Sequence, residues 1–208
     1  MLQIIPALLV AITVVIQCLA VQMSRYRLSR MNARPPHHGL ALMSGMLAVA
    51  AIILRLYQND SAVGVLFMTI MTGCMTLMTL TDAASCRLPR PFTIMYLISG
   101  SAFRLWQGDW LTGLCSAGFW FLLLLLFRQY TSYRRKTETI GLGDVFLIAG
   151  IAIWSPPGDI PWIVATAAGG ALLYLWCNRQ RRITRELPFG PFLCASQYAF
   201  TFYPGGLW

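Results

Sequence analysis

Eight apolar stretches alternate with short polar segments along the chain. They cover approximately residues 1–22, 39–57, 62–82, 91–105, 110–127, 141–155, 161–177 and 190–204. A helix needs about 20 predominantly apolar residues to cross the hydrocarbon core of a bilayer. Eight such helices would use roughly 160 residues, which leaves no room for a second globular domain. The pattern therefore predicts an all-α, polytopic membrane protein in which residues 1–208 form a single membrane-embedded domain.

The composition agrees with a membrane protein. Hydrophobic residues make up 57% of the chain, charged residues make up 11%, and the mean hydropathy is +0.62. A soluble domain has about 25% charged residues, and a disordered chain has far less apolar surface to bury. The net charge of +9 does not indicate nucleic-acid binding, because the basic residues lie between apolar stretches.

Basic residues are concentrated in alternate connections. Fourteen of the 16 Lys and Arg residues follow the first, third, fifth and seventh apolar stretches. These fourteen are Arg25, Arg27, Arg30, Arg34, Arg87, Arg90, Arg128, Arg134, Arg135, Lys136, Arg179, Arg181, Arg182 and Arg185. Short basic loops stay in the cytoplasm. We therefore expect eight crossings, with the amino and carboxyl termini both outside.

Aromatic residues are expected at the outer ends of the helices, where amphipathic rings favour the membrane interface. The residues in such positions are Tyr57, Trp106, Trp110, Trp154, Trp162 and Trp208. Arg55 and Arg104 lie near the same ends and are predicted to extend outward toward water.

The six cysteines form no CxxC pair, and the adjacent His37 and His38 have no further ligands nearby in the sequence, so no metal or cofactor is expected.

Asp82 and Asp144 stand near predicted cytoplasmic helix ends, where an ionisable residue is costly and is therefore a candidate for function. Taken alone, Asp82 fits a carboxylate at the water interface, and Asp144 fits the N-cap of its helix. The apolar segment that begins at Asp144 has 12 residues and would be about 18 Å long as a helix. The hydrocarbon core is about 30 Å thick. Either this helix begins earlier, near Thr137, or the site is thinned or re-entrant, and in both cases Asp144 should lie below the cytoplasmic surface.

Two carboxylates on one side of a membrane suit aspartyl proteolysis. One ionised Asp takes a proton from water, while the other, protonated, polarises the scissile carbonyl group. The predicted topology permits this arrangement for Asp82 and Asp144, since it places both on the cytoplasmic side, but it does not show that they are close.

Three motifs, in order and on consistent sides, carry a family resemblance. Asp82, followed after five residues by Leu88-Pro89, resembles the first motif of type IV prepilin peptidases. Gly141-Leu142-Gly143-Asp144 resembles their GxGD motif. Pro188-Phe189-Gly190-Pro191-Phe192 is similar to the PFGP segment that opens their last helix. The resemblance runs from about residue 40 to the end of the chain.

The resemblance implies an integral aspartyl endopeptidase of the bacterial inner membrane, with its active site facing the cytoplasm. Its substrates would be prepilins or pseudopilins, which family members cut after a Gly between a basic leader and a hydrophobic helix. Asp82 and Asp144 map onto the two catalytic aspartates. The supporting residues of the site would be Gly141, Gly143, Leu88, Pro89 and Gly190.

The chain also departs from the family pattern. Larger members carry a zinc-binding insertion with paired CxxC motifs after the first helix, linked to amino-terminal methylation. Here that loop has 16 residues and no Cys, so the chain resembles a short form and methyl transfer is doubtful. Phe146 stands where many members have Lys, and Arg90 replaces a common acidic residue. Glu138 and Glu186 are candidate anchors for a basic leader.

Other functions remain as alternatives. Another GxGD-type intramembrane protease, with a preflagellin-like substrate, would share these motifs. A transporter or a noncatalytic assembly scaffold is the alternative from another class, since buried acids also serve proton coupling. The sequence does not identify the precursor, the pilus or secretion system, or the oligomeric state.

Overall fold

The computed structural model describes residues 4–31, 33, 38–58, 61–135, 141–178 and 187–202. Within these ranges the chain forms eight helices and no strand. The helices are α1 (Ile4–Arg30), α2 (His38–Tyr57), α3 (Ala62–Ser85), α4 (Arg90–Gln107), α5 (Trp110–Arg135), α6 (Leu142–Trp154), α7 (Ile160–Cys177) and α8 (Gly190–Phe202). The prediction of an all-α fold is confirmed, and each apolar stretch corresponds to one helix.

The helices differ in their ability to cross a membrane. Among the described residues, five helices are long and apolar enough to do so, namely α1, α2, α3, α5 and α7. By contrast, α6 and α8 have only 13 residues each. They are therefore about 20 Å long, well short of a hydrocarbon core of about 30 Å.

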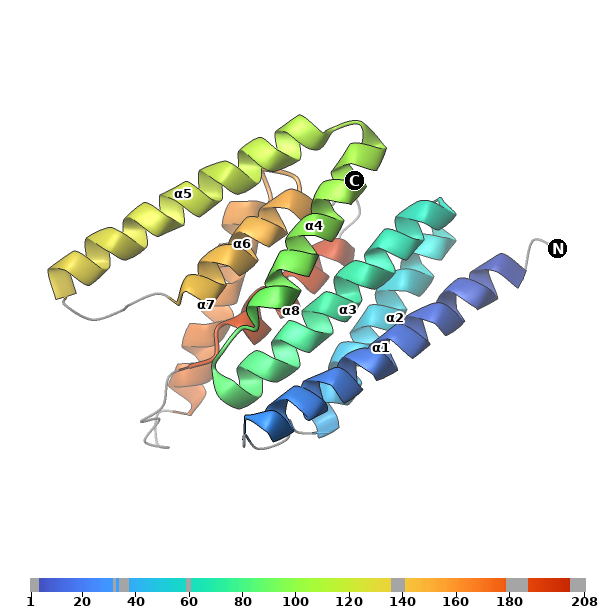
Figure 1. Cartoon of the computed structure of the whole chain (residues 1–208), viewed down its shortest axis with the longest axis horizontal. Helices are drawn as coiled ribbons and strands as arrows, with labels where there is room; N and C mark the ends of the chain where they lie inside the picture. The colour runs from blue at the N-terminus through green and yellow to red at the C-terminus, as the bar shows by residue number, and fades with distance from the viewer. Residues whose placement is uncertain are drawn as a thin grey trace.

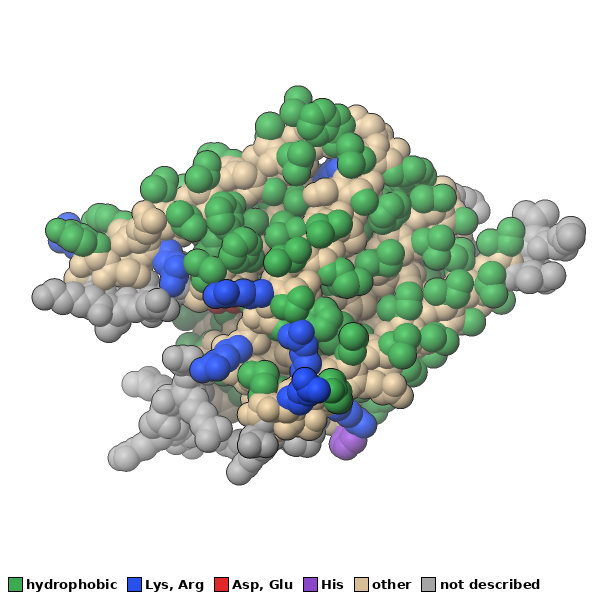
Figure 2. Space-filling view, viewed as in Figure 1, with side chains coloured by type: hydrophobic (Ala, Val, Ile, Leu, Met, Phe, Trp, Pro, Cys, Tyr) green, Lys and Arg blue, Asp and Glu red, His purple; other side chains and the backbone are tan. Residues whose placement is uncertain are grey.

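Successive helices run in opposite directions (Figure 1), so one end of the bundle collects the carboxyl ends of α1, α3, α5 and α7 and the amino ends of the other four. We call it the basic end. Its described arginines are Arg25, Arg27, Arg30, Arg87, Arg90, Arg128, Arg134 and Arg135. Figure 2 shows most Lys and Arg side chains of the visible face gathered where α1 and α5 end, while apolar side chains cover the rest.

Two helices form the centre of the bundle. α3 packs against α1, α2, α4 and α8, and α6 packs against α4, α5, α7 and α8. Every residue of α3 from Met71 to Asp82 is buried, as is every residue of α6 from Leu147 to Trp154. Asp82, in the last turn of α3, is therefore held by the core.

Two helices extend further than their apolar stretches. α1 continues to Arg30 and α5 continues to Arg135, whereas the apolar pattern ended near residues 22 and 127. Arg is a good helix former, so a helix readily continues into a basic segment. α5 is consequently about 39 Å long, and it runs past the beginning of α6 at the basic end (Figure 1).

The prediction that Arg55 and Arg104 extend outward is wrong, because both side chains are buried. Nε of Arg104 donates to the carbonyl oxygen of Ile153 at 2.8 Å, and a terminal nitrogen donates to that of Ser155 at 3.0 Å. These carbonyls lie at the end of α6, where helical partners run out. Arg55 donates to the carbonyl oxygen of Thr201 at 3.4 Å.

The prediction that Trp154 faces the interface is also wrong. Its side chain is fully buried, its ring stacks on Phe103 with centroids 5.3 Å apart, and its Nε1 donates to the carbonyl oxygen of Tyr96. Gly100 makes room for the ring, since a Cβ there would lie 2.8 Å from Nε1. The other aromatic residues of the set are exposed as predicted, namely Tyr57, Trp106, Trp110 and Trp162, and Trp208 lies outside the described residues.

Candidate active site

Asp82 lies in the last turn of α3 and is only 4% exposed. The helix ends at Cys86, whose φ of 50° places it in the left-handed region. The N–H of Cys86 donates to the carbonyl oxygen of Asp82 at 2.7 Å. The chain then runs through Arg87 and Leu88 to Pro89, which caps the start of α4 in an extended conformation. The first motif therefore forms the turn between α3 and α4.

Asp144 lies in the first turn of α6, and it is not the N-cap of that helix. The N-cap is Gly141, whose extended backbone also shows that the helix does not begin near Thr137. The carboxylate folds back over the cap, since a Cβ on Gly141 would lie 3.2 Å from Oδ2 of Asp144. The first glycine of GxGD thus leaves space for the side chain of its aspartate, which corrects the N-cap interpretation.

Gly143 brings α6 close to the turn that follows Asp82. A Cβ at position 143 would lie 2.9 Å from Cβ and 3.2 Å from Cδ1 of Leu88. Contacts of this kind require the neighbour to move. Because Leu88 belongs to the same turn as Asp82, the second glycine of GxGD sets the distance between the two motifs.

The third motif contacts Asp82 directly. α8 begins at Gly190, whose backbone N–H donates a hydrogen bond of 2.8 Å to Oδ2 of Asp82. A Cβ at this position would lie 2.8 Å from the same oxygen. The positive end of the α8 dipole also points at the carboxylate and favours negative charge there.

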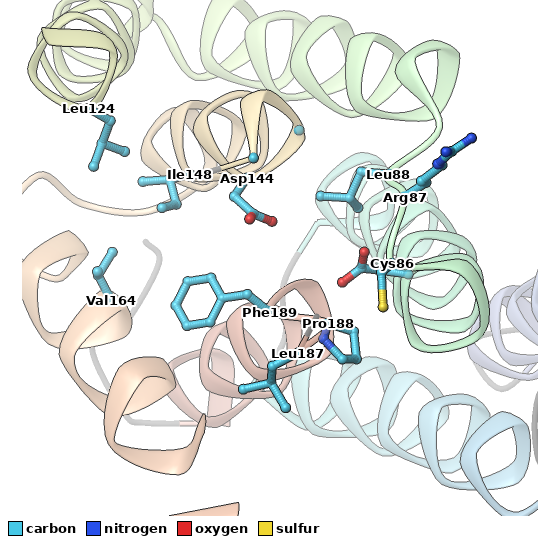
Figure 3. A pocket seen from close by; sticks show the side chains of 13 residues that line it. Cys86, Arg87, Leu88, Leu124, Asp144, Ile148, Val164, Leu187, Pro188 and Phe189 are labelled. Atoms are coloured by element: carbon cyan, nitrogen blue, oxygen red, sulfur yellow. The ribbon is translucent and has the colours of Figure 1, made fainter. Parts of the chain in front are cut away.

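Both carboxylates line one cavity of about 840 Å³. Its walls come from α3, α5, α6, α7 and the two motif loops, through Asp82, Cys86, Arg87, Leu88, Leu124, Gly141, Gly143, Asp144, Ile148, Val164, Leu187, Pro188 and Phe189. Figure 3 shows the carboxylate of Asp144 pointing into the space between Leu88 and Phe189. Because Asp82 and Asp144 share this lining, the site brings together two carboxyl groups that would repel each other if both were ionised.

The structure places most of the predicted supporting residues around this cavity. Leu88, Gly141 and Gly143 line it, and Gly190 contacts Asp82. Pro89 is not among the lining residues, and it caps α4 instead. The candidate leader anchors, Glu138 and Glu186, lie outside the described residues.

The two departures from the family pattern lie away from the cavity lining. Phe146 packs against Phe121 of α5, with ring centroids 5.2 Å apart. Arg90 is exposed at the first residue of α4. Neither residue lines the cavity that holds the carboxylates.

Several lining residues were not predicted from the sequence. Ile148 follows Asp144 by four residues in α6, which places the two on one helix face, so spacing could have indicated Ile148; Cys86 enters the lining where α3 ends. Leu124 and Val164 carry no local signal, because they are ordinary apolar residues of long apolar helices. Among the described residues, no group of three or more His, Cys, Asp and Glu side chains could hold a metal ion.

Comparison with known proteins agrees with the motifs. The family model described as the type IV leader peptidase family matches residues 69–176, which include both aspartates. The prepilin leader peptidase/N-methyltransferases of Burkholderia pseudomallei strains 1026b and K96243 are each 32% identical over 175 residues. These matches cover 79% of this chain and 53% of each relative, so the chain spans about half their length.

No solved structure matches the chain. The family match extends over half of the sequence and contains the segments that bring α3, α4 and α6 together around the cavity. The chain therefore belongs to the type IV leader peptidase family.

Proposed function

We propose that this chain is an integral membrane aspartyl endopeptidase that removes the leader peptides of type IV prepilins or pseudopilins, with residues 1–208 acting as one peptidase domain. The observation that carries the proposal is the convergence of Asp82 and Asp144 on one cavity, from helices far apart in sequence. Aspartyl proteolysis requires two carboxyl groups that act on one water molecule.

The hydrogen bond from Gly190 suggests different roles for the two aspartates. Oδ2 of Asp82 accepts a backbone N–H, and a hydrogen bond of this kind favours the ionised form of a carboxyl group over the protonated form. Asp82 is then the base that takes a proton from water, and protonated Asp144 donates to the scissile carbonyl oxygen. The resulting hydroxide attacks the carbonyl carbon. The tetrahedral intermediate collapses when Asp82 passes the proton that it took from water to the leaving nitrogen, the C–N bond breaks, and a hydroxyl of the intermediate returns a proton to Asp144.

We propose that the cavity faces the cytoplasm, that the chain crosses the bacterial inner membrane eight times, and that its amino terminus is outside. Both aspartates lie at the basic end of the bundle, and clusters of Arg stay in the cytoplasm. A position toward one end also differs from the midplane sites of many transporters.

The proposal covers the peptidase activity alone. The relatives are named for both peptidase and N-methyltransferase activities. Here the loop after the first apolar stretch lacks the cysteines of the zinc-binding insertion that the family resemblance links to methylation.

Co-expression with a candidate prepilin tests the proposal. We expect the precursor to lose its leader, and mass analysis of the new amino terminus should place the cut between the basic leader and the hydrophobic helix. The same spectrum reports whether a methyl group has been added. A panel of prepilins and pseudopilins that all keep their leaders in membranes containing the folded chain would contradict the proposed activity.

A further inference from the structure

The cavity with both carboxylates extends sideways between α5 and α7. Leu124 of α5 and Val164 of α7 form its two edges, and both are half-buried. Figure 3 shows them on opposite sides of the space, with Ile148 and Phe189 further in. In the described part of the chain α5 packs against α4 and α6, α7 packs against α6 and α8, and these two helices do not contact each other. Among the described residues, the cavity is therefore open between α5 and α7.

The cavity is apolar on the side that faces α5 and α7. The cavity-lining residues contributed by α5 and α7 are Leu124 and Val164, and the apolar residues Ile148 and Phe189 line the same cavity. Ile148 follows Asp144 by one helical turn, so their Cβ atoms are about 6 Å apart. An apolar chain lying between α5 and α7 would therefore reach Asp144 within one turn of α6.

Among the described residues, α6 is much shorter than α5, and the difference lies at the basic end. α6 has 13 residues and α5 has 26, so about half of α5 has no counterpart in α6. Figure 1 shows this excess at the end where α6 begins. Next to Asp144, therefore, the described residues of α6 do not fill the space beside α5.

Three other apolar grooves lie on the described surface. One separates α1 from α2 and includes Leu42, one lies over α4, α5 and α6 and includes Phe146, and one lies near the start of α5 and includes Thr112. None of them is lined by Asp82 or Asp144. Of the four described surface openings named here, the one between α5 and α7 leads to the carboxylates. A membrane-embedded partner would therefore reach the carboxylates through it.

We propose that the opening between α5 and α7, edged by Leu124 and Val164, is the docking surface for the hydrophobic helix of the substrate. The assignment rests on the proposed function. An apolar helix matches the apolar walls of the opening. Because the opening leads into the cavity, the end of a helix bound there would lie next to the two carboxylates. The substrate segment at the scissile bond then lies beside Asp82 and Asp144.

Photo-crosslinking in the full chain tests the docking surface. A photoreactive phenylalanine analogue replaces Leu124 or Val164 in membranes that also contain a prepilin. Leu42 of α2 and Leu172 of α7 are matched controls, because both are exposed apolar residues that do not line the cavity. We expect adducts with the prepilin from positions 124 and 164. We expect no prepilin adducts from positions 42 and 172. Adducts only with lipid at 124 and 164, or equal prepilin adducts at all four positions, would overturn the assignment.

A second experiment narrows the opening. Val164→Trp should slow cleavage of a full prepilin more than cleavage of a peptide that contains only the leader junction. Leu172→Trp on the same helix should leave both rates as in the wild type. Equal rates for Val164→Trp and the wild type on the full prepilin would overturn the docking surface while leaving the proposed function intact. A wild-type chain that cuts neither substrate would contradict the proposed function itself, and the docking assignment with it.

Discussion

The backbone N–H of Gly190 lies 2.8 Å from Oδ2 of Asp82, to which it donates a hydrogen bond. The two residues are 108 positions apart in the sequence, and they join the end of α3 to the start of α8. No Cβ fits between them, because it would lie 2.8 Å from the carboxylate oxygen and 3.2 Å from Cγ. The glycine of the PFGP segment therefore allows α8 to hold the carboxylate in place.

Gly190→Ala should reduce prepilin cleavage while leaving the protein in the membrane. The added methyl group must push Asp82 or the start of α8 aside, which breaks the hydrogen bond. Loss of a hydrogen bond to a charged group costs about 1.5–3 kcal/mol, so we expect kcat to fall by roughly 10- to 100-fold. Initial rates in detergent or liposomes measure the effect.

Gly169→Ala is the control for this substitution. A Cβ at position 169, in the middle of α7, would meet nothing within 4 Å, and Ala is a better helix former than Gly. This variant should cleave at the wild-type rate. If Gly190→Ala also keeps the wild-type rate, then the contact with Asp82 does not position the carboxylate.

Gly143→Ala should also impair cleavage, through the distance between the two aspartate motifs. The new Cβ would lie 2.9 Å from Cβ of Leu88, so α6 and the turn after Asp82 must separate by several tenths of an ångström. Misplacement of catalytic groups by about 1 Å can cost on the order of 100-fold in rate, and we expect a loss of about 10-fold. Gly45→Ala, with nothing within 4 Å, is the matched control. Equal rates for the two variants would count against this role of Gly143.

Arg104→Met should lower stability more than it lowers the rate of cleavage. The substitution leaves the carbonyl oxygens of Ile153 and Ser155 without the donors that they have in the wild type. Each buried carbonyl that loses its partner costs about 1–3 kcal/mol. Thermal unfolding in detergent should show a lower midpoint, whereas Arg90→Met, at an exposed position, should unfold like the wild type. A midpoint unchanged by Arg104→Met would show that this cap of α6 does not contribute to stability.

The proposed orientation can be tested with cysteine labelling. Pro157 lies in the exposed turn between α6 and α7, at the end opposite to Arg90. Pro157→Cys should react with a membrane-impermeant maleimide in intact spheroplasts, above the background of the wild type. Arg90→Cys should react only after the membrane is opened. The reverse pattern would place both aspartates outside the cytoplasm.

The sequence predicted the helices because each apolar stretch had a clear start and end. It also indicated all three motifs that surround the aspartates, since Asp82, Asp144 and Gly190 stand in recognisable local patterns. It did not predict that α1 and α5 extend into basic segments, because Arg is compatible with both a loop and a helix.

Residues whose environment depends on packing were predicted poorly. Position along a helix gives the depth of Trp154 and Arg104 in the bundle, but it does not say which neighbour they face. Both turn inward in the structure, Trp154 because Gly100 leaves it room and Arg104 because α6 ends beside it. Leu124 and Val164 were missed for the same reason, since only the arrangement of α5 and α7 places them at the cavity.

The most direct test of the account compares three conservative variants in one cleavage assay. Asp82→Asn and Asp144→Asn remove one carboxylate each from the cavity, and Asp159→Asn changes a half-buried aspartate at the opposite end of the bundle. With equal amounts of each protein in the membrane, the account predicts that Asp82→Asn and Asp144→Asn release no leader, while Asp159→Asn processes the prepilin like the wild type. Wild-type processing by either Asp82→Asn or Asp144→Asn would contradict the assignment of that residue to the catalytic pair.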